Sequence, residues 1–245
     1  MKEYQPKADC LVGKTILITG AGDGIGKTLA LKCAEYGATV ILLGKTVKKL
    51  EEVYDLIEQL GKQQASILPV DLQGATESHY ADLADTIKRE YGKLDALVHN
   101  AGQLGVLGPF GQIEKSTWDE VLQVNLTSQF MLTKALLPVL SLAENASTIF
   151  TTSGVGNQGR AYWGAYSVSK FATEGMMQTL ADEYENSTQR FNAINPGATR
   201  TKMRASAFPA EDVSLLKGAE DIMPTYLYLL SDDSLEVNGQ RLNAQ

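Results

Sequence analysis

The sequence predicts an α/β fold: one doubly wound domain in which helices flank a predominantly parallel seven-stranded sheet. Short aliphatic and β-branched runs alternate with longer helical stretches along the chain, an order typical of parallel strands joined by helical crossovers. With 245 residues, of which 44% are hydrophobic, the chain can bury a sizeable core in one α/β domain. A glycine-rich turn directly follows the first apolar run, at residues 19–26.

Strands and helices are expected in strict alternation. Pro69 removes one ladder donor, which disfavours the last residues of the third strand. Thr117 and Glu120 have the spacing of a capping box, which predicts that the fourth helix begins there. No repeat or linker interrupts the pattern, so residues 1–245 are predicted to be one domain. The expected strands are 15–19, 38–43, 66–70, 94–98, 148–152, 191–194 and 241–242, and the expected helices are 24–36, 47–60, 76–91, 117–137, 166–185 and 220–230.

Composition excludes several classes of partner. Twenty-two basic against 29 acidic residues leave a net charge of −7, which argues against nucleic acid or an anionic membrane as the main partner. No run of about 18 apolar residues occurs, and the first residues do not resemble a signal peptide, so we expect a cytoplasmic protein. Cys10 and Cys33 are the only cysteines; Cys33 falls in a predicted helix and is expected to be a core residue. We expect no metal site.

The glycine-rich turn lies where a strand ends and a helix begins. Of its four glycines, Gly20, Gly24 and Gly26 have a spacing that differs from the GxGxxG fingerprint. Glycines permit a close approach of a phosphate to the backbone, and a helix amino terminus adds free N–H donors and a positive dipole end. A turn without a ligand is the alternative. The strand–turn–helix context favours a dinucleotide pyrophosphate.

The end of the second strand selects between two dinucleotides. An acid there, about 20 residues after the glycines, binds the ribose 2′-hydroxyl of NAD. This chain has Gly44-Lys45 instead, and Lys45 can neutralise a 2′-phosphate. Asp23 opposes this interpretation because it would repel a phosphate. We therefore predict NADP(H) over NAD(H), with an NAD(H)-dependent enzyme and a solvated Lys45 as the alternatives.

Two further segments follow strand ends. Asp71 comes after the third strand, where its carboxylate can hold an adenine amino group or merely cap a turn. Asn100-Ala101-Gly102 follows the fourth strand. Ligands bind at the carboxyl edge of such sheets, so both segments are candidate cofactor contacts.

Tyr166 and Lys170 stand four residues apart on a predicted helix, and Ser153 follows the fifth strand. Positions i and i+4 share one helix face. A lysine cation stabilises phenolate and lowers a tyrosine pKa that ordinarily lies near about 10. Tyr166 is therefore expected to exchange a proton near neutral pH, which together with a nucleotide-binding turn indicates a redox enzyme.

These motifs together resemble the short-chain dehydrogenase/reductase family, whose members have a Rossmann fold. The matching motifs are TGxxxGIG at 19–26, NAG at 100–102, Asn125 after a valine, Ser153, YxxxK at 166–170, and Asn195-Pro196-Gly197 with Thr201. A closer likeness is to the YciK-like bacterial oxidoreductases, through the segments 159–166, 171–177 and 203–209. His99 stands where the family usually has another asparagine.

The resemblance implies hydride transfer between a nicotinamide and a carbonyl or secondary alcohol. Tyr166 would be the general acid or base, Ser153 would hold the substrate oxygen, Lys170 would bind the nicotinamide ribose, and Asn125 would keep a water in a proton relay. Pro196, Gly197 and Thr201 would hold the carboxamide. The full set of expected cofactor contacts is Gly20, Asp23, Gly24, Ile25, Gly26, Lys45, Asp71, Leu72, Asn100, Ala101, Gly102, Tyr166, Lys170, Pro196, Gly197, Thr199 and Thr201.

A short loop at about 202–216 is expected to contact the substrate, a small-molecule carbonyl or alcohol. Arg160 and Trp163 are expected to line the pocket with Ser153 and Tyr166, and either Arg160 or Arg204 is a candidate for binding an anionic group. An epimerase or dehydratase with a retained cofactor is disfavoured by chain length and glycine spacing. A regulatory or assembly protein with little turnover is the other alternative. The resemblance also implies a homodimer or homotetramer.

Overall fold

The computed structural model describes residues 4–61 and 64–245. Within them, seven strands form one sheet in the order β3-β2-β1-β4-β5-β6-β7, with every pair parallel. This is a doubly wound sheet, as predicted, although it is entirely rather than predominantly parallel. The strands are β1 (Thr15–Thr19), β2 (Thr39–Gly44), β3 (Ala65–Pro69), β4 (Ala96–His99), β5 (Ala146–Thr151), β6 (Gln189–Asn195) and β7 (Arg241–Asn243).

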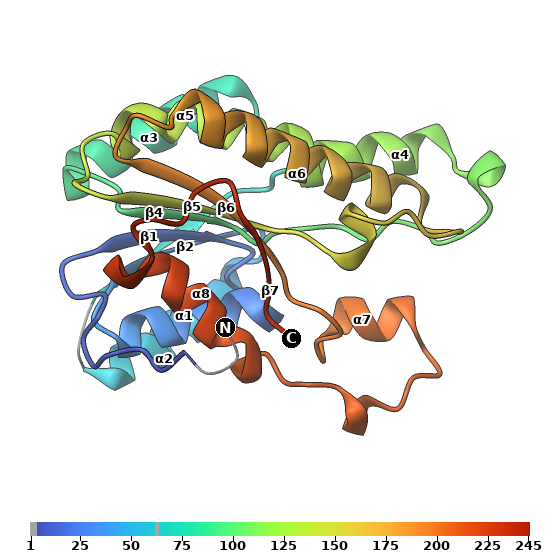
Figure 1. The fold of residues 1–245 in the computed structure, drawn as a ribbon, viewed down its shortest axis with the longest axis horizontal. Helices are drawn as coiled ribbons and strands as arrows, with labels where there is room; N and C mark the ends of the chain where they lie inside the picture. The colour runs from blue at the N-terminus through green and yellow to red at the C-terminus, as the bar shows by residue number, and fades with distance from the viewer. Residues whose placement is uncertain (1–3, 62–63) are drawn as a thin grey trace.

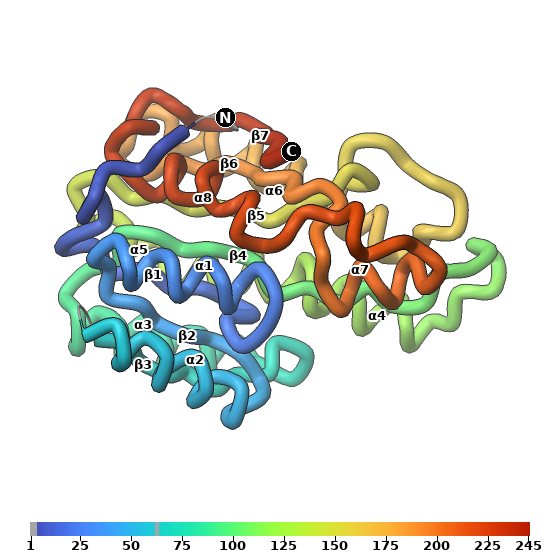
Figure 2. The backbone as a smooth tube through the Cα atoms, turned by 90° about the horizontal axis from the view of Figure 1, so that it is seen from below, coloured from blue at the N-terminus to red at the C-terminus, as the bar shows by residue number. Residues whose placement is uncertain are grey.

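Helices cover both faces of the sheet (Figure 1). One face carries α3, α4, α5 and α6, and the other carries α1, α2 and α8, which lie side by side in Figure 2. The helices are α1 (Gly24–Glu35), α2 (Val47–Leu60), α3 (Glu77–Tyr91), α4 (Lys115–Leu122), α5 (Ser128–Leu140), α6 (Gly164–Glu183), α7 (Lys202–Ala207) and α8 (Met223–Leu230).

The strands are apolar because both faces of the sheet are covered. Along β1, Ile16 and Ile18 pack into the core beneath α1 and α8, whereas Leu17 packs into the core beneath α3 and α5. Side chains alternate across a strand, so a strand that is buried on both faces reads as a continuous apolar run. This burial is the reason that the strands are recognisable from the sequence.

Several helix boundaries differ from the prediction. The fourth helix begins at Lys115 and not at Thr117, so the capping box predicted at Thr117 and Glu120 is wrong. A capping box forms instead at Thr76, where His79 takes the place that an acid usually has. The predicted helix 117–137 is divided by a π-helical turn, Gln123–Thr127. The predicted helix 220–230 is the 3-10 turn Glu220–Ile222 followed by α8.

Two properties of residues 4–61 and 64–245 concern membranes and metals. No helix there has both the length and the apolar character needed to cross a bilayer. No three His, Cys, Asp or Glu side chains gather there as potential metal ligands. Both cysteines are free, and Cys33 is fully buried in the core, as predicted.

Candidate active site

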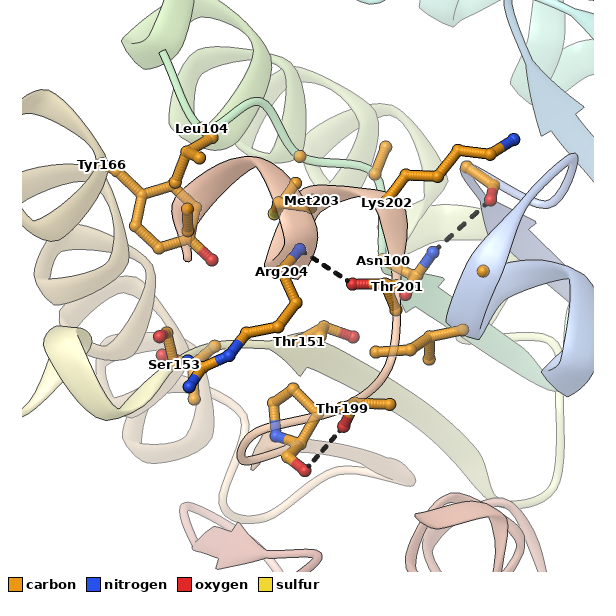
Figure 3. A pocket seen from close by; sticks show the side chains of 18 of the residues that line it. Asn100, Leu104, Thr151, Ser153, Tyr166, Thr199, Thr201, Lys202, Met203 and Arg204 are labelled. Atoms are coloured by element: carbon orange, nitrogen blue, oxygen red, sulfur yellow. Dashed lines mark hydrogen bonds between the residues drawn. The ribbon is translucent and has the colours of Figure 1, made fainter. Parts of the chain in front are cut away.

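The carboxyl ends of β1, β4, β5 and β6 meet at a cavity of about 320 Å³. β1 and β4 are neighbours in the sheet, and the strands that follow each of them lie toward opposite edges. The cavity lies at this point, which is where doubly wound folds bind ligands. Figure 3 shows Tyr166 and Ser153 on one side of this cavity and Thr201 and Asn100 on the other. The predicted site residues that line it are Gly20, Asp23, Gly24, Ile25, Asn100, Ala101, Gly102, Ser153, Trp163, Tyr166, Lys170, Pro196, Gly197, Thr199 and Thr201.

The glycine-rich turn is fastened to the end of β4. The Thr19 hydroxyl accepts hydrogen bonds from the backbone N–H groups of Asn100 and Ala101, each at 3.0 Å. The Asn100 amide donates to the Thr19 carbonyl at 3.2 Å. Gly20 adopts φ +67°, and a Cβ on Gly26 would lie 2.3 Å from the Gly20 carbonyl oxygen. Close packing therefore requires glycine at Gly26, while backbone conformation requires it at Gly20.

Asp23 caps the amino terminus of α1 and is paired with two lysines. Its carboxylate accepts from the backbone N–H of Gly24 at 2.9 Å and from the ammonium groups of Lys49 at 2.7 Å and Lys202 at 2.8 Å. The hydrogen bond from Lys202, followed in size by the one from Lys49, holds the Asp23 pKa well below its ordinary value. Two cations therefore accompany the single anion, and their charges oppose the repulsion of phosphate expected from Asp23.

Four predicted contacts lie outside the cavity lining. Lys45 is exposed in the turn between β2 and α2. Asp71 accepts from the backbone N–H of Gln73 at 3.1 Å, the turn-capping arrangement considered as its alternative. Leu72 is buried in the core beneath α3. Gly26 packs against the Gly20 carbonyl, where a larger residue would not fit.

Tyr166 and Lys170 share one face of α6, as their spacing predicts, and both are buried. The Lys170 ammonium donates to the Thr151 carbonyl at 2.7 Å and lies 5.6 Å from the centre of the Tyr166 ring. Ser153 follows β5 on the same cavity wall. Three of the four side chains in the predicted catalytic set, Ser153, Tyr166 and Lys170, thus line one cavity.

The predicted lowering of the Tyr166 pKa is wrong for the protein alone. Burial raises the Tyr166 pKa to about 12, and a hydrogen bond with Ser153 acts in the opposite direction. Burial also lowers the Lys170 pKa to about 8, with the Glu174 carboxylate opposing that change. Removal from water penalises the charged form of each group, and here that cost exceeds the attraction between lysine and phenolate.

Asn125 lies in the π-helical turn and is fully buried. Its amide donates to the Gln103 carbonyl at 2.9 Å and to the Ser169 hydroxyl at 3.0 Å, and its carbonyl accepts from the Gln103 backbone N–H at 2.7 Å. Such turns are frequent at functional sites. The side chain joins the loop after β4 to α6, and the water relay predicted for Asn125 stays a prediction.

The loop after β6 is held by its own hydrogen bonds and by Gln245. The Gln245 amide donates to the Pro196 carbonyl at 2.7 Å and to the Thr199 hydroxyl at 3.2 Å. Thr201 caps α7 by accepting from the Arg204 backbone N–H at 3.1 Å. These contacts give the segment after Pro196 a defined path along the cavity.

Comparison with known proteins decides the family. The family model described as short chain dehydrogenase matches residues 14–212, which is most of the chain. This protein is a short-chain dehydrogenase. The enzyme assignment and the resemblance drawn from its motifs are therefore confirmed.

The short-chain dehydrogenase has relatives of almost the same length. It is 51% identical to the oxidoreductase YciK of Escherichia coli (strain K12), over 99% of this chain and 96% of that protein. A Shigella flexneri 2a short chain dehydrogenase complexed with NADP is 50% identical, with a TM-score of 0.96 over 98% of this chain and all of that one. An Escherichia coli CFT073 counterpart complexed with NADPH is 51% identical, with a TM-score of 0.95 over the same shares.

The substrate residues predicted for this short-chain dehydrogenase divide between two adjoining cavities. Trp163 lines both, whereas Arg160 lines only the second, next to Phe208. Arg204 donates from Nε and from its terminal nitrogen to Glu211, at 2.6 and 2.5 Å. Its guanidinium is therefore already paired. The predicted loop 202–216 contains α7 and the 3-10 turn Val213–Leu215.

Sequence reasoning missed several polar contacts of this short-chain dehydrogenase. Lys49 and Lys202 pair with Asp23, yet they come from α2 and α7. Glu174 pairs with Arg241 across 67 positions of the chain. Only Glu174 carried a local signal, because it stands four residues after Lys170 on the same helix face. The other contacts depend on how distant segments pack.

Proposed function

We propose that this short-chain dehydrogenase is an NADP(H)-dependent oxidoreductase that transfers hydride between the nicotinamide and a carbonyl or secondary alcohol. The observation that carries the proposal is one cavity lined by Ser153, Tyr166 and Lys170 at one end and by the glycine-rich turn at the other. The turn fits a dinucleotide because its glycines leave the backbone open and α1 presents its amino terminus. The nicotinamide supplies the redox chemistry.

Tyr166 is the proton donor in the reductive direction. Its raised pKa keeps the phenol protonated at neutral pH, so it can give a proton to the oxygen of a carbonyl as hydride arrives at carbon. Ser153 hydrogen-bonds the same oxygen and orients it toward Tyr166. Lys170 binds the ribose and, as a cation, stabilises the phenolate that the reaction leaves. Asn125 holds the neighbouring loop and supports a water-mediated path for returning the proton.

The preference for NADP(H) over NAD(H) rests on charge. No carboxylate follows Gly44 at the end of β2, and Lys45 is exposed there. Lys49 and Lys202 offset the one acid of the turn, Asp23. Two relatives were crystallised with NADP or NADPH, which supports the same choice.

Replacing Lys45 by alanine tests this preference. We expect the affinity for NADPH to fall about tenfold, because the 2′-phosphate loses one charge-assisted contact, while the affinity for NADH stays unchanged. Fluorescence titration of each variant with both dinucleotides measures the effect. Lys88→Ala removes an equal charge from the exposed end of α3 and serves as the control. Equal losses for NADPH and NADH, or a wild-type preference for NADH, would contradict the proposal.

Arg160 is proposed to recognise an anionic group on the substrate. It lines the second cavity, which also borders Ser153, whereas Arg204 is already paired with Glu211. A substrate whose carbonyl lies at Ser153 and Tyr166 would therefore extend toward Arg160.

The variant Arg160→Ala separates an anionic from a neutral substrate. We expect kcat/KM for carboxylated carbonyl compounds to fall about tenfold and kcat/KM for neutral carbonyls to change little, since only the former lose an ion pair. Arg89→Ala, at an exposed position on α3, is the charge-matched control. An unchanged ratio of the two kcat/KM values would remove Arg160 from the substrate site.

A homodimer or homotetramer is proposed from the surface of two helices. Phe130 on α5 and Val168 and Phe171 on α6 are large hydrophobic side chains that are exposed. Val168 and Phe171 are three residues apart and share a helix face, and exposed apolar side chains that adjoin one another mark interaction sites. They support pairing through these helices, as the family resemblance implies.

A further inference from the structure

Glu174 is a buried carboxylate one helical turn beyond Lys170. Its side chain is 7% exposed, and one of its oxygens accepts from the Thr152 hydroxyl at 2.6 Å and from Nε of Arg241 at 2.8 Å. A charge removed from water in this way is unfavourable unless it is paired and hydrogen-bonded. The mechanism proposed above does not use Glu174, and its position needs an explanation.

Arg241 joins this carboxylate to the strand end that carries Ser153. It lies at the start of β7, opposite Ala193 of β6, and its guanidinium donates to the Ser153 carbonyl at 3.2 Å. Thr152 and Ser153 are consecutive residues after β5. Glu174 therefore contacts Thr152 and Arg241 contacts Ser153, so the pair connects α6, the end of β5 and β7.

Glu174 and Lys170 also contact the same glycine. A Cβ on Gly156 would lie 2.9 Å from Cβ of Lys170 and 3.1 Å from Oε1 of Glu174. The two side chains thus flank the 3-10 turn Gly154–Gly156 that follows Ser153. A buried carboxylate one helical turn away favours the protonated form of lysine, and the Glu174 charge raises the Lys170 pKa against the effect of burial.

The other titratable groups around Lys170 do not supply this negative charge. Tyr166 keeps its proton at neutral pH because burial raises its pKa to about 12. Burial, and to a smaller extent the Lys170 charge, lowers the His99 pKa to about 3, so His99 on β4 is neutral. Burial raises the pKa of Tyr226, which contacts β5 at Thr151 from α8. Arg241 is cationic, so its charge favours the neutral form of Lys170, whereas the Glu174 charge favours the protonated form.

We infer that Glu174 and Arg241 are positioning residues of this site: Glu174 provides the buried negative charge that keeps Lys170 protonated, and Arg241 holds Glu174 against the strand end that carries Ser153. The role in catalysis rests on the proposed function, whereas the effect on Lys170 does not. The two partners have opposite charges, so their removal has opposite effects on the lysine.

The test is a pH titration of Lys170 in protein labelled with ε-¹³C-lysine, with the Lys170 signal assigned by its loss in Lys170→Met. In Glu174→Gln, which keeps the size of the side chain and an oxygen for Thr152, the midpoint should fall by about one pH unit or more. In Arg241→Gln the Glu174 charge is no longer offset, so the midpoint should rise. A merely structural role would loosen the packing in both variants and move both midpoints up, toward the value of a hydrated lysine.

Asp95→Asn is the matched control. Asp95 is a buried carboxylate that pairs with Lys93 at 2.6 Å and precedes β4, at the opposite edge of the sheet from the cavity. It should leave the Lys170 midpoint unchanged. An unchanged or raised midpoint in folded Glu174→Gln would overturn the inference. If that variant does not fold, Arg241→Lys, which keeps the charge but loses the guanidinium contacts, should leave the Lys170 midpoint in place while Arg241→Gln raises it. Equal rises in the two Arg241 variants, or no rise in Arg241→Gln, would overturn the inference.

A kinetic measurement separates this inference from the proposed function. If the wild-type protein reduces a carbonyl with NADPH, the alkaline limb of the kcat profile should move to lower pH in Glu174→Gln, following the Lys170 midpoint. A kcat profile that stays in place while the midpoint moves would refute the catalytic part of the inference. Shifted midpoints in a protein without carbonyl turnover would refute the proposed function and support the electrostatic part.

Discussion

Replacing Tyr166 by phenylalanine is expected to abolish turnover while leaving the dinucleotide bound. The phenol hydroxyl is the only part removed, and positioned proton transfer contributes about 10²–10⁴-fold to rate. The ring stays in its place, 5.8 Å from the centre of the Trp163 ring. We therefore expect kcat/KM for a carbonyl substrate to fall at least about a thousandfold, with NADPH affinity changed by less than about twofold because a single neutral hydroxyl is lost.

The matched control is Tyr80→Phe. Tyr80 is a buried tyrosine on α3 that does not line the cavity, so removal of its hydroxyl should leave turnover unchanged. Steady-state kinetics and NADPH titration of both variants measure the contrast. Full activity in Tyr166→Phe would remove Tyr166 from the mechanism. Weak turnover of every carbonyl by the wild-type protein, with tight NADPH binding, would favour the regulatory alternative instead.

Gly26→Ala is expected to destabilise the protein and to remove dinucleotide binding together. The new Cβ would lie 2.3 Å from the Gly20 carbonyl oxygen and 2.5 Å from Nδ2 of Asn100. Neither can move freely, because Thr19 and Asn100 hold the turn against β4. Alanine within α1 would otherwise gain about 1 kcal/mol over glycine, so the steric overlap decides the sign. We expect a loss of about 1–3 kcal/mol in the free energy of unfolding.

Denaturant unfolding and NADPH titration measure both parts of this prediction. Gly111→Ala is the control, since a Cβ there meets no atom within 4 Å and the φ angle is not positive. It should preserve stability and binding. Unchanged stability in Gly26→Ala would mean that the turn can shift at little cost, and the close packing of Gly26 would not be required.

The confirmed predictions depend on local sequence. The β1–turn–α1 unit was recognisable because a buried strand, three spaced glycines and a helix follow one another directly. The helix break at Asn125 was not recognisable, because the π-helical turn is supported by Gln103 and Ser169 from other segments. The capping box was predicted at Thr117, although the helix begins two residues earlier and His79 completes a box elsewhere.

The sequence alone determined which groups share a surface: i,i+4 spacing puts Tyr166 and Lys170 on one helix face, and strand–turn–helix order puts the glycines at the edge of the sheet. The tertiary structure alone decided how those groups behave. Lysines from α2 and α7 converge on Asp23, Arg241 reaches Glu174 from β7, and burial raises the Tyr166 pKa that its neighbour was expected to lower. Helix periodicity is local, whereas desolvation and charge pairing depend on every layer that packs around a residue.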